Sequence, residues 1–351
     1  MPEMDIRGLD RQLRSGSVSN VYFVYGTEAY MKRTAVEKLL VRCVDGDMAD
    51  FNYQRFAGAD TDLGEVADAL SQLPMMAEYR CVLLEDFDIV RAGADASDRL
   101  CACIENVPET SVFIIWQNDV ETPAKDRKTD KIAKLCAKHG STLRLDIPRT
   151  GELASTLCEK ADELGCRLNK NDAYYLIDRC GRDMTTLFTE LEKLAIYCGR
   201  KSITREAVEL VCPPSVEADV FQISRFILQG KNDDAFRVTE RLLAQKVRPV
   251  EIFSQLGSNF IDLYRAKAAA GASMGENELI EAFPDDYSER KRFRVTNALN
   301  DHSNYSLAAM RRYIELLYNA ELALKSGRTD RQTCLEQLIA RLCAVRNEGR
   351  R

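Results

Sequence analysis

Three apolar runs of strand length, all within the first 145 residues, constrain the fold of this chain more than any other feature of its sequence. They are Val21–Tyr25 (VYFVY), 81–84 (CVLL) and 112–116 (VFIIW). None of them alternates apolar with polar residues, so each is typical of a strand buried on both faces of a parallel sheet. Two weaker strand candidates are 52–56 and 142–145.

Helical patterns lie between these runs, at 28–44, 63–73, 98–106 and 128–139. The apolar residues of the second pattern follow the spacing of one helix face: Leu63, Val66, Ala67, Leu70 and Leu73. Strands that alternate with helices in this way predict a doubly wound α/β domain with a parallel sheet over residues 1–146.

Strand-like runs stop after Pro148, and the rest of the chain reads as helix. A first set of helices extends to about Val211 and is followed by the punctuation Pro213-Pro214. We therefore expect a small helical domain over 147–214. An all-α C-terminal domain of about five helices should occupy 215–351.

Net charge and hydropathy narrow the classes of function that this chain can have. The chain of 351 residues has a net charge of -6, whereas a protein that binds nucleic acid mainly through its own field is usually basic. No apolar run approaches the ~20 residues of a membrane span, and the N-terminal MPEMDIRGLDRQLRSG carries charges where a signal peptide is apolar. We expect a cytoplasmic protein with protein partners and no membrane contact.

The twelve cysteines are scattered singly through periodic segments, as small buried hydrophobes are in a reducing compartment. Cys101 and Cys103 form the one close pair, with no second pair and no nearby His to complete a tetrahedral zinc site. The cysteines therefore predict no disulfide and no metal site. We also expect no cofactor for the chain itself.

The loop after the first strand, YGTEAYMKR, has the position of a phosphate-binding loop. Against the pattern G-x-x-x-x-G-K-[ST], Gly26 and Lys32 match by spacing. Met31 replaces the second glycine, Arg33 replaces the hydroxyl that holds magnesium, and Glu28 places a carboxylate beside a polyanion. We interpret the loop as degenerate. An active ATPase with an unusual loop remains the alternative, and Lys32 is its main support.

Polar pairs follow two of the apolar strands. Glu85-Asp86 has the place of the acidic pair of a nucleotide site, and Gln117-Asn118 has the place of a polar sensor. The competing interpretation is that these are ordinary polar residues at the carboxyl edge of the sheet.

Several segments together resemble one family. They are YGTEAYMKRTAVEKLL, LPMMAEYRCVLLEDFD and FIIWQND in the first domain, CGRDMTTLFTELEKLAIYCG with ITREAVELV in the second, and VFQISRFILQGKNDDAFRVTERLLAQKVRPVEIFSQL, FRVTNALN and ELALKSGRTD in the third. In this order and spacing they are similar to the delta subunits of the bacterial DNA polymerase III clamp loader. The resemblance covers most of the chain.

The resemblance implies a fold and a function. It implies an AAA+-like domain of P-loop NTPase type without ATPase activity, a helical lid and a helical collar for oligomerisation. Such subunits bind and open the beta sliding clamp for loading onto primed DNA. Their other partners are the tau/gamma and delta-prime subunits, which bind the ATP. The chain would then be a non-enzymatic part of the DNA-directed DNA polymerase holoenzyme, a nucleotidyltransferase complex.

The clamp contact of this family maps onto Leu73, Pro74, Met75 and Met76. Pro74 ends a helix, so two adjacent apolar side chains project from a turn that is normally polar. The alternative is that both thioethers fill the core. Many relatives carry Leu-Phe or Phe-Phe here, and the Met pair lacks the aromatic anchor that is typical of interface hot spots.

A short basic cluster, Lys125, Arg127, Lys128 and Lys131, is interleaved with acidic residues. It is typical of a solvated helix start, and contact with template phosphate or a neighbouring subunit is the alternative. A last alternative for the whole chain is a stationary ring component that does not open the clamp.

Overall fold

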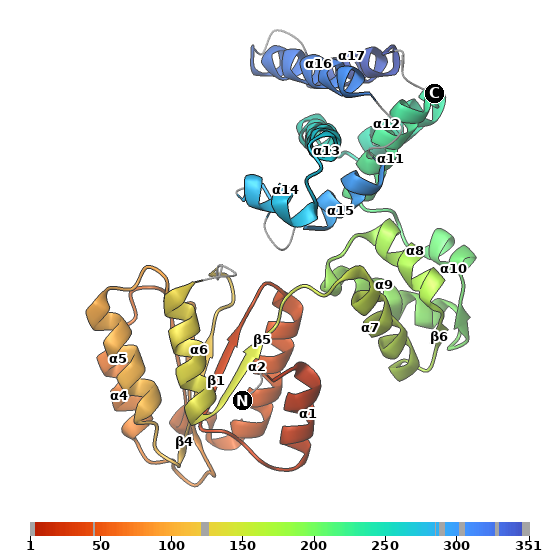
Figure 1. Cartoon of the computed structure of the whole chain (residues 1–351). Coiled ribbons are helices and arrows are strands. Elements are labelled where there is room, and N and C mark those ends of the chain that lie inside the picture. Colours follow the sequence, from red (N-terminus) through yellow and green to blue (C-terminus); the bar gives the residue numbers. More distant parts are fainter. Residues whose placement is uncertain are drawn as a thin grey trace. The chain divides into compact units, whose positions relative to one another are not determined.

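The computed structural model describes residues 4–44, 46–120, 126–284, 286–287, 292–301, 306–326 and 330–345. The chain divides into two compact units, Met1–Pro148 and Arg149–Arg351 (Figure 1). The first unit ends two residues after the predicted boundary at 146. Among the described helices, none combines the length and the apolar character that crossing a membrane requires.

The first unit is built on a five-stranded sheet in which all pairings are parallel and the strand order is β2-β3-β4-β1-β5. The strands are β1 (Val21–Tyr25), β2 (Tyr53–Ala57), β3 (Arg80–Glu85), β4 (Ser111–Trp116) and β5 (Ser141–Arg144). β1, β3 and β4 are buried along their whole length, as their continuous apolar runs predict. The structure confirms the predicted α/β class of this unit.

Helices cover both faces of this sheet (Figure 1). They are α1 (Ile6–Arg14), α2 (Ala29–Cys43), α3 (Ala49–Asn52), α4 (Leu63–Ser71), α5 (Ala94–Glu105) and α6 (Arg127–His139), with a 3-10 turn η1 (Gly46–Met48). Tyr22 and Val24 of β1 face α1 and α2, whereas Val21 and Phe23 face α4, α5 and α6. Successive side chains of a strand point to opposite faces, so the unit has three layers.

Several helices in the first unit differ from what the sequence predicts. α1 has no counterpart there, although Asp5 caps it by accepting from the N–H of Gly8 at 2.7 Å. α5 begins at Ala94, four residues before the predicted start, because Gly93 takes the N-cap position. α1 was missed although Ile6, Leu9 and Leu13 follow helical spacing. The early start of α5 was missed because its first residues, 94–97, carry little apolar periodicity.

The second unit begins with α7 (Thr150–Glu163), α8 (Lys170–Cys180), α9 (Met184–Tyr197) and α10 (Arg205–Val211). Two strands of two residues each, β6 (Arg167–Leu168) and β7 (Ser202–Ile203), pair in parallel between them. The expectation that no strand follows Pro148 is therefore wrong. Strands this short cannot produce the periodicity on which the prediction depended.

Seven helices follow among the described residues, where the sequence analysis expected about five. They are α11 (Val216–Gln229), α12 (Asn232–Ala244), α13 (Pro249–Gly271), α14 (Glu276–Ala282), α15 (Arg292–Asp301), α16 (Leu307–Ser326) and α17 (Arg331–Cys343). Gly230, Pro249 and Gly275 lie at helix ends, where Gly and Pro punctuate the sequence, whereas the chain between α15 and α16 has no Gly or Pro to mark it. Because 149–351 forms one compact unit, the separation of 147–214 from 215–351 stays a prediction.

Candidate functional site

The turn between α4 and β3 presents apolar side chains to solvent. Leu73 is 80% exposed, Met75 53% and Met76 84%, and Pro74 between them is half-buried. We call the side chains of Leu73, Met75 and Met76 the apolar tip. Neither thioether lies in the core, and both Met side chains are exposed on the turn. Large apolar groups gathered on a short exposed turn favour contact with a partner protein.

A buried asparagine holds the apolar tip in place. Asn52, the last residue of α3, is 1% exposed, and its side chain accepts from the N–H of Met75 at 2.6 Å. The same amide donates to the carbonyl of Met75 at 2.8 Å and to that of Met48 at 3.2 Å. Two bonds to one residue fix its main chain. Met76 follows with a φ of 53°, in the left-handed region that few non-glycine residues adopt.

Arg80, the first residue of β3, fixes the base of the same turn. Its guanidinium donates to the carbonyl of Ala69 at 2.5 Å and to that of Phe51 at 2.6 Å. The first bond satisfies a carbonyl in the last turn of α4 that has no partner within the helix. Burial lowers the pKa of Arg80, yet its bonds hold α4, α3 and β3 together. The apolar tip therefore projects from a rigid base.

Asn52 and Arg80 were missed by the sequence analysis. Each lies at an end of a predicted strand, a place where a polar residue attracts no notice. Their roles depend on the parallel register of β2 with β3, in which Tyr53 lies opposite Cys81. Phe51 was missed too, although its ring is exposed beside Asn52.

The degenerate phosphate loop is closed against β5. Gly26 has a φ of 120°, and a Cβ on it would lie 2.3 Å from the carbonyl oxygen of Leu145. The glycine is thus required for close approach of two main chains. This requirement is independent of any phosphate.

Protein groups accept from the N–H donors of this loop. The N–H of Thr27 donates to Oδ1 of Asp146 at 3.1 Å, and that of Glu28 donates to the carbonyl of Leu145 at 2.9 Å. The carboxylate of Glu28 accepts from the N–H of Tyr30 at 3.0 Å and caps α2. A phosphate binds at a helix N-terminus through donors of this kind. Two carboxylates hold those positions here.

The ammonium of Lys32 is engaged by main-chain carbonyls. The residue is 1% exposed, and its ammonium donates to the carbonyls of Gln117 at 2.7 Å and Asn118 at 2.9 Å. Met31 beside it is partly buried and packs against the core between the sheet and the helices α1 and α2, and Arg33 is exposed. The residue that matches the phosphate-binding lysine by spacing therefore joins α2 to the end of β4.

The acidic pair after β3 is also engaged by protein groups. Glu85 forms an ion pair with Arg55, with its Oε2 2.7 Å from Nε. Oδ1 of Asp86 accepts from the N–H groups of Asn118 at 2.8 Å and of Asp119 at 2.9 Å. Both carboxylates thus stabilise the carboxyl edge of the sheet.

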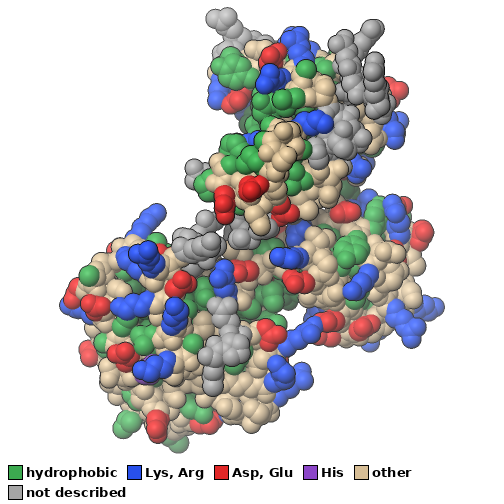
Figure 2. All heavy atoms as spheres, viewed as in Figure 1, with side chains coloured by type: hydrophobic (Ala, Val, Ile, Leu, Met, Phe, Trp, Pro, Cys, Tyr) green, Lys and Arg blue, Asp and Glu red, His purple; other side chains and the backbone are tan. Residues whose placement is uncertain are grey.

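The basic cluster has mixed roles. Lys128 donates to the carbonyls of Val90 and Ala92 at 2.8 and 2.7 Å, and Lys131 lies 3.6 Å from a carboxylate oxygen of Asp98. Arg127 is exposed, and Lys125 lies outside the described residues. Figure 2 shows Lys and Arg interspersed with Asp and Glu on the visible face of this unit. Lys128 stabilises the fold through its two hydrogen bonds. Contact of the cluster with DNA or a neighbouring subunit stays a prediction.

Two family models match this chain. Residues 22–145 match the model described as DNA polymerase III, delta subunit, and residues 217–342 match the DNA polymerase III delta subunit, C-terminal domain. The first match contains the apolar tip, Asn52 and Arg80. The second contains most of the seven C-terminal helices.

Relatives support the same assignment over most of the chain. The chain is 23% identical over 352 residues to DNA polymerase III subunit delta of Bacillus subtilis (strain 168), covering 96% of each. It is 23% identical over 270 residues to the probable DNA polymerase III subunit delta of Aquifex aeolicus (strain VF5), covering 75% of each. The solved Bacillus subtilis DNA clamp loader delta protein (YqeN) has the same fold, with a TM-score of 0.72, 21% identity, and coverage of 95% of this chain and 98% of that one.

Proposed function

Because this chain belongs to the family of DNA polymerase III delta subunits, we propose that it binds the beta sliding clamp through its apolar tip and opens the ring for loading onto primed DNA. The observation that carries the proposal is the exposure of Met75 and Met76 on a turn fixed by buried hydrogen bonds. Each thioether would contribute roughly 1.5 to 3 kcal/mol on burial in a hydrophobic pocket of the clamp, before the cost of ordering it.

The rigid base of the apolar tip reduces that ordering cost. A contact that is already fixed in the free protein loses less conformational freedom when it binds. Asn52 fixes the main chain of Met75, and Arg80 fixes the end of α4, so the side chains alone are ordered on binding. This preorganisation offsets part of what the Met pair lacks relative to an aromatic anchor.

We propose further that the chain does not hydrolyse ATP itself. The proposal is supported by Lys32, which is buried on two carbonyls, and by the carboxylates of Asp146 and Glu28, which accept from loop N–H groups. ATP binding would then belong to the tau/gamma and delta-prime subunits. The helices after Pro214 would form the collar that assembles with them, in the cytoplasm.

Size-exclusion chromatography of the full chain with its cognate clamp tests the proposal. The double variant Met75→Ala, Met76→Ala should lose at least about 100-fold in affinity, because it gives up most of that burial energy. The matched control is Ile196→Ala, Leu210→Ala, which removes two other exposed apolar side chains from the second unit. Co-elution of the Met variant with the clamp at wild-type affinity would refute the proposal.

Normal assembly of the wild type with its loader partners but no clamp binding would identify a stationary ring component. ATP turnover that is lost in Lys32→Ala would identify an active ATPase.

A further inference from the structure

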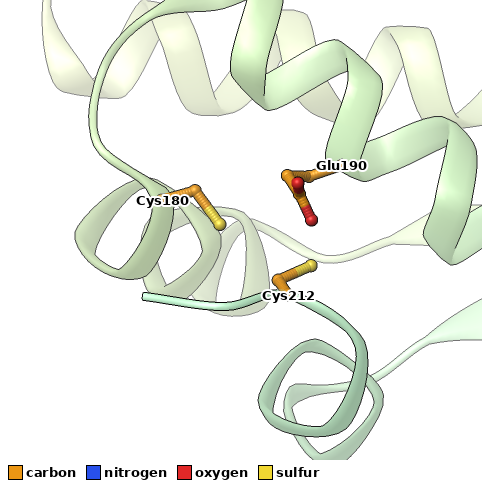
Figure 3. Close-up of side chains that lie close together, drawn as sticks. All are labelled: Cys180, Glu190 and Cys212. Atoms are coloured by element: carbon orange, nitrogen blue, oxygen red, sulfur yellow. The ribbon is translucent and has the colours of Figure 1, made fainter. Parts of the chain in front are cut away.

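A group of three ligand-type side chains lies inside the second unit, far in sequence from the apolar tip. Cys180 is the last residue of α8, Glu190 belongs to α9, and Cys212 directly follows α10. The two sulfurs and a carboxylate oxygen all lie within 4.8 Å of one another. Figure 3 shows the three side chains converging from separate elements on one small space.

The carboxylate in this group is incompletely satisfied by the described residues. Glu190 is 9% exposed, and its Oε1 lies 2.7 Å from the ammonium of Lys193. Its Oε2 is buried and has no hydrogen-bond partner among the residues that the structure describes. A buried anionic oxygen without a partner is costly. A cation between this oxygen and the sulfurs would remove that cost.

Neighbouring bonds fix the two cysteines. The guanidinium of Arg179 donates to the carbonyl of Cys212 at 2.6 Å and to that of Glu209 at 3.0 Å. The N–H of Ser215 donates to the carbonyl of Arg179 at 2.8 Å. These bonds join the end of α8 to the segment after α10, so both sulfurs are held on a rigid frame. Metal sites need such support around their ligands.

We propose that Cys180, Glu190 and Cys212 bind a thiophilic divalent cation of the Zn²⁺ type. Two thiolates and a carboxylate are ligand types that Zn²⁺ accepts in tetrahedral sites, and the fourth position would take water. The three ligands carry three negative charges, of which the ion neutralises two, and Lys193 lies beside the carboxylate. The three residues are too far apart in the sequence to form a spacing motif, so the sequence gives no sign of the group.

Such an ion would tie α8, α9 and α10 together immediately before Pro213-Pro214 and α11. It would stabilise the helical part of the second unit that precedes the collar helices. The inference is independent of clamp binding, because none of its three ligands belongs to the apolar tip.

Metal content of the full chain tests the proposal. Reduced, purified protein is loaded with Zn²⁺, dialysed against a competing chelator and assayed for metal. We expect about one ion per chain, with an affinity at least about tenfold lower in Cys180→Ser, Cys212→Ser and Glu190→Gln. Cys166→Ser is the matched control, because it also buries a hydroxyl in this part of the chain and should retain the ion.

A spectroscopic measurement on the unmodified chain avoids any folding defect of the variants. Co²⁺ added in place of Zn²⁺ should give a thiolate-to-metal charge-transfer band that Zn²⁺ abolishes and Mg²⁺ does not. Absence of that band would overturn the proposal. So would a loss of zinc in Cys166→Ser equal to that in Cys180→Ser.

Discussion

At the scale of single residues, buried polar side chains decide what the exposed ones can do. Met75 and Met76 offer the apolar surface, yet the position of that surface depends on Asn52, which is buried beneath it. Lys32 is the converse case. It matches a phosphate-binding lysine by spacing, but its ammonium donates hydrogen bonds to two main-chain carbonyls instead.

Asn52→Ala should weaken clamp binding although Asn52 lies beneath the apolar tip. Of the three side-chain hydrogen bonds that are lost, the two to Met75, of about 0.5–1.5 kcal/mol each, had fixed its main chain, so we expect roughly tenfold lower affinity. Titration calorimetry with the clamp measures the change. Asn106→Ala is the control, because it removes a hydrogen bond from a side-chain amide to the carbonyl of Ala102 at the end of α5. In the double-Met variant background, Asn52→Ala should have no further effect on binding. An additional loss there would contradict a positioning role.

Lys32→Met should lower stability without changing nucleotide affinity. The substitution leaves the carbonyls of Gln117 and Asn118 without their buried donor, which should cost about 1–3 kcal/mol of unfolding free energy. Denaturant unfolding measures this cost, and fluorescent ATP analogues report binding. Lys38→Met is the control, because Lys38 pairs with Asp10 at a partly exposed site that is worth about 0–1 kcal/mol. ATP binding by the wild type that disappears in Lys32→Met would contradict this view of the loop.

At the scale of elements, the sequence predicts the helices and strands that carry a regular apolar pattern. It does not predict contacts between residues that are distant in the sequence. The strands β1, β3 and β4 are within a residue of their predicted bounds because burial on both faces leaves a continuous apolar run. The exposure of Met75 and Met76 follows from Pro74 and the turn that it starts. The contact of Asn52 with Met75, and the group formed by Cys180, Glu190 and Cys212, could not be predicted. Each joins elements whose proximity is created by the fold alone.

The α11–α12 pair should give a measurable pH dependence. Asp219 of α11 is buried and lies 2.6 Å from Arg241 of α12, and burial raises the pKa of its carboxyl. A raised pKa means that the folded state holds the proton more tightly than the unfolded chain does, so this contribution to stability is complete below about pH 3.9. It is lost as the pH rises through the folded pKa.

Thermal midpoints of wild type and Asp219→Asn, measured from about pH 4 upward, isolate this contribution because the amide does not titrate. The wild type should lose stability relative to the variant as the pH rises. A difference between the two proteins that does not change with pH, or that changes in the opposite sense, would contradict the prediction.

At the scale of the whole molecule, the apolar tip and everything that holds it belong to one unit. Asn52, Arg80 and the three side chains of the tip all lie within Met1–Pro148, which has a core on each face of its own sheet. Family models match within each unit, at 22–145 and at 217–342. Clamp recognition and assembly with other subunits would then be physically separable.

Cleavage between the two units should therefore leave clamp binding intact. Arg149 is exposed directly after Pro148, so limited trypsin digestion should release a folded fragment of residues 1–149. Mass spectrometry identifies the cut, and Arg149→Gln serves as the resistant control. The isolated fragment should bind the clamp with an affinity comparable to that of the full chain, because each bond that positions Met75 is retained. The same fragment with Met75→Ala and Met76→Ala should not bind. If the unmodified fragment is folded by circular dichroism yet binds no better than that variant, then residues beyond 149 contribute to the clamp contact, and the apolar tip is not sufficient.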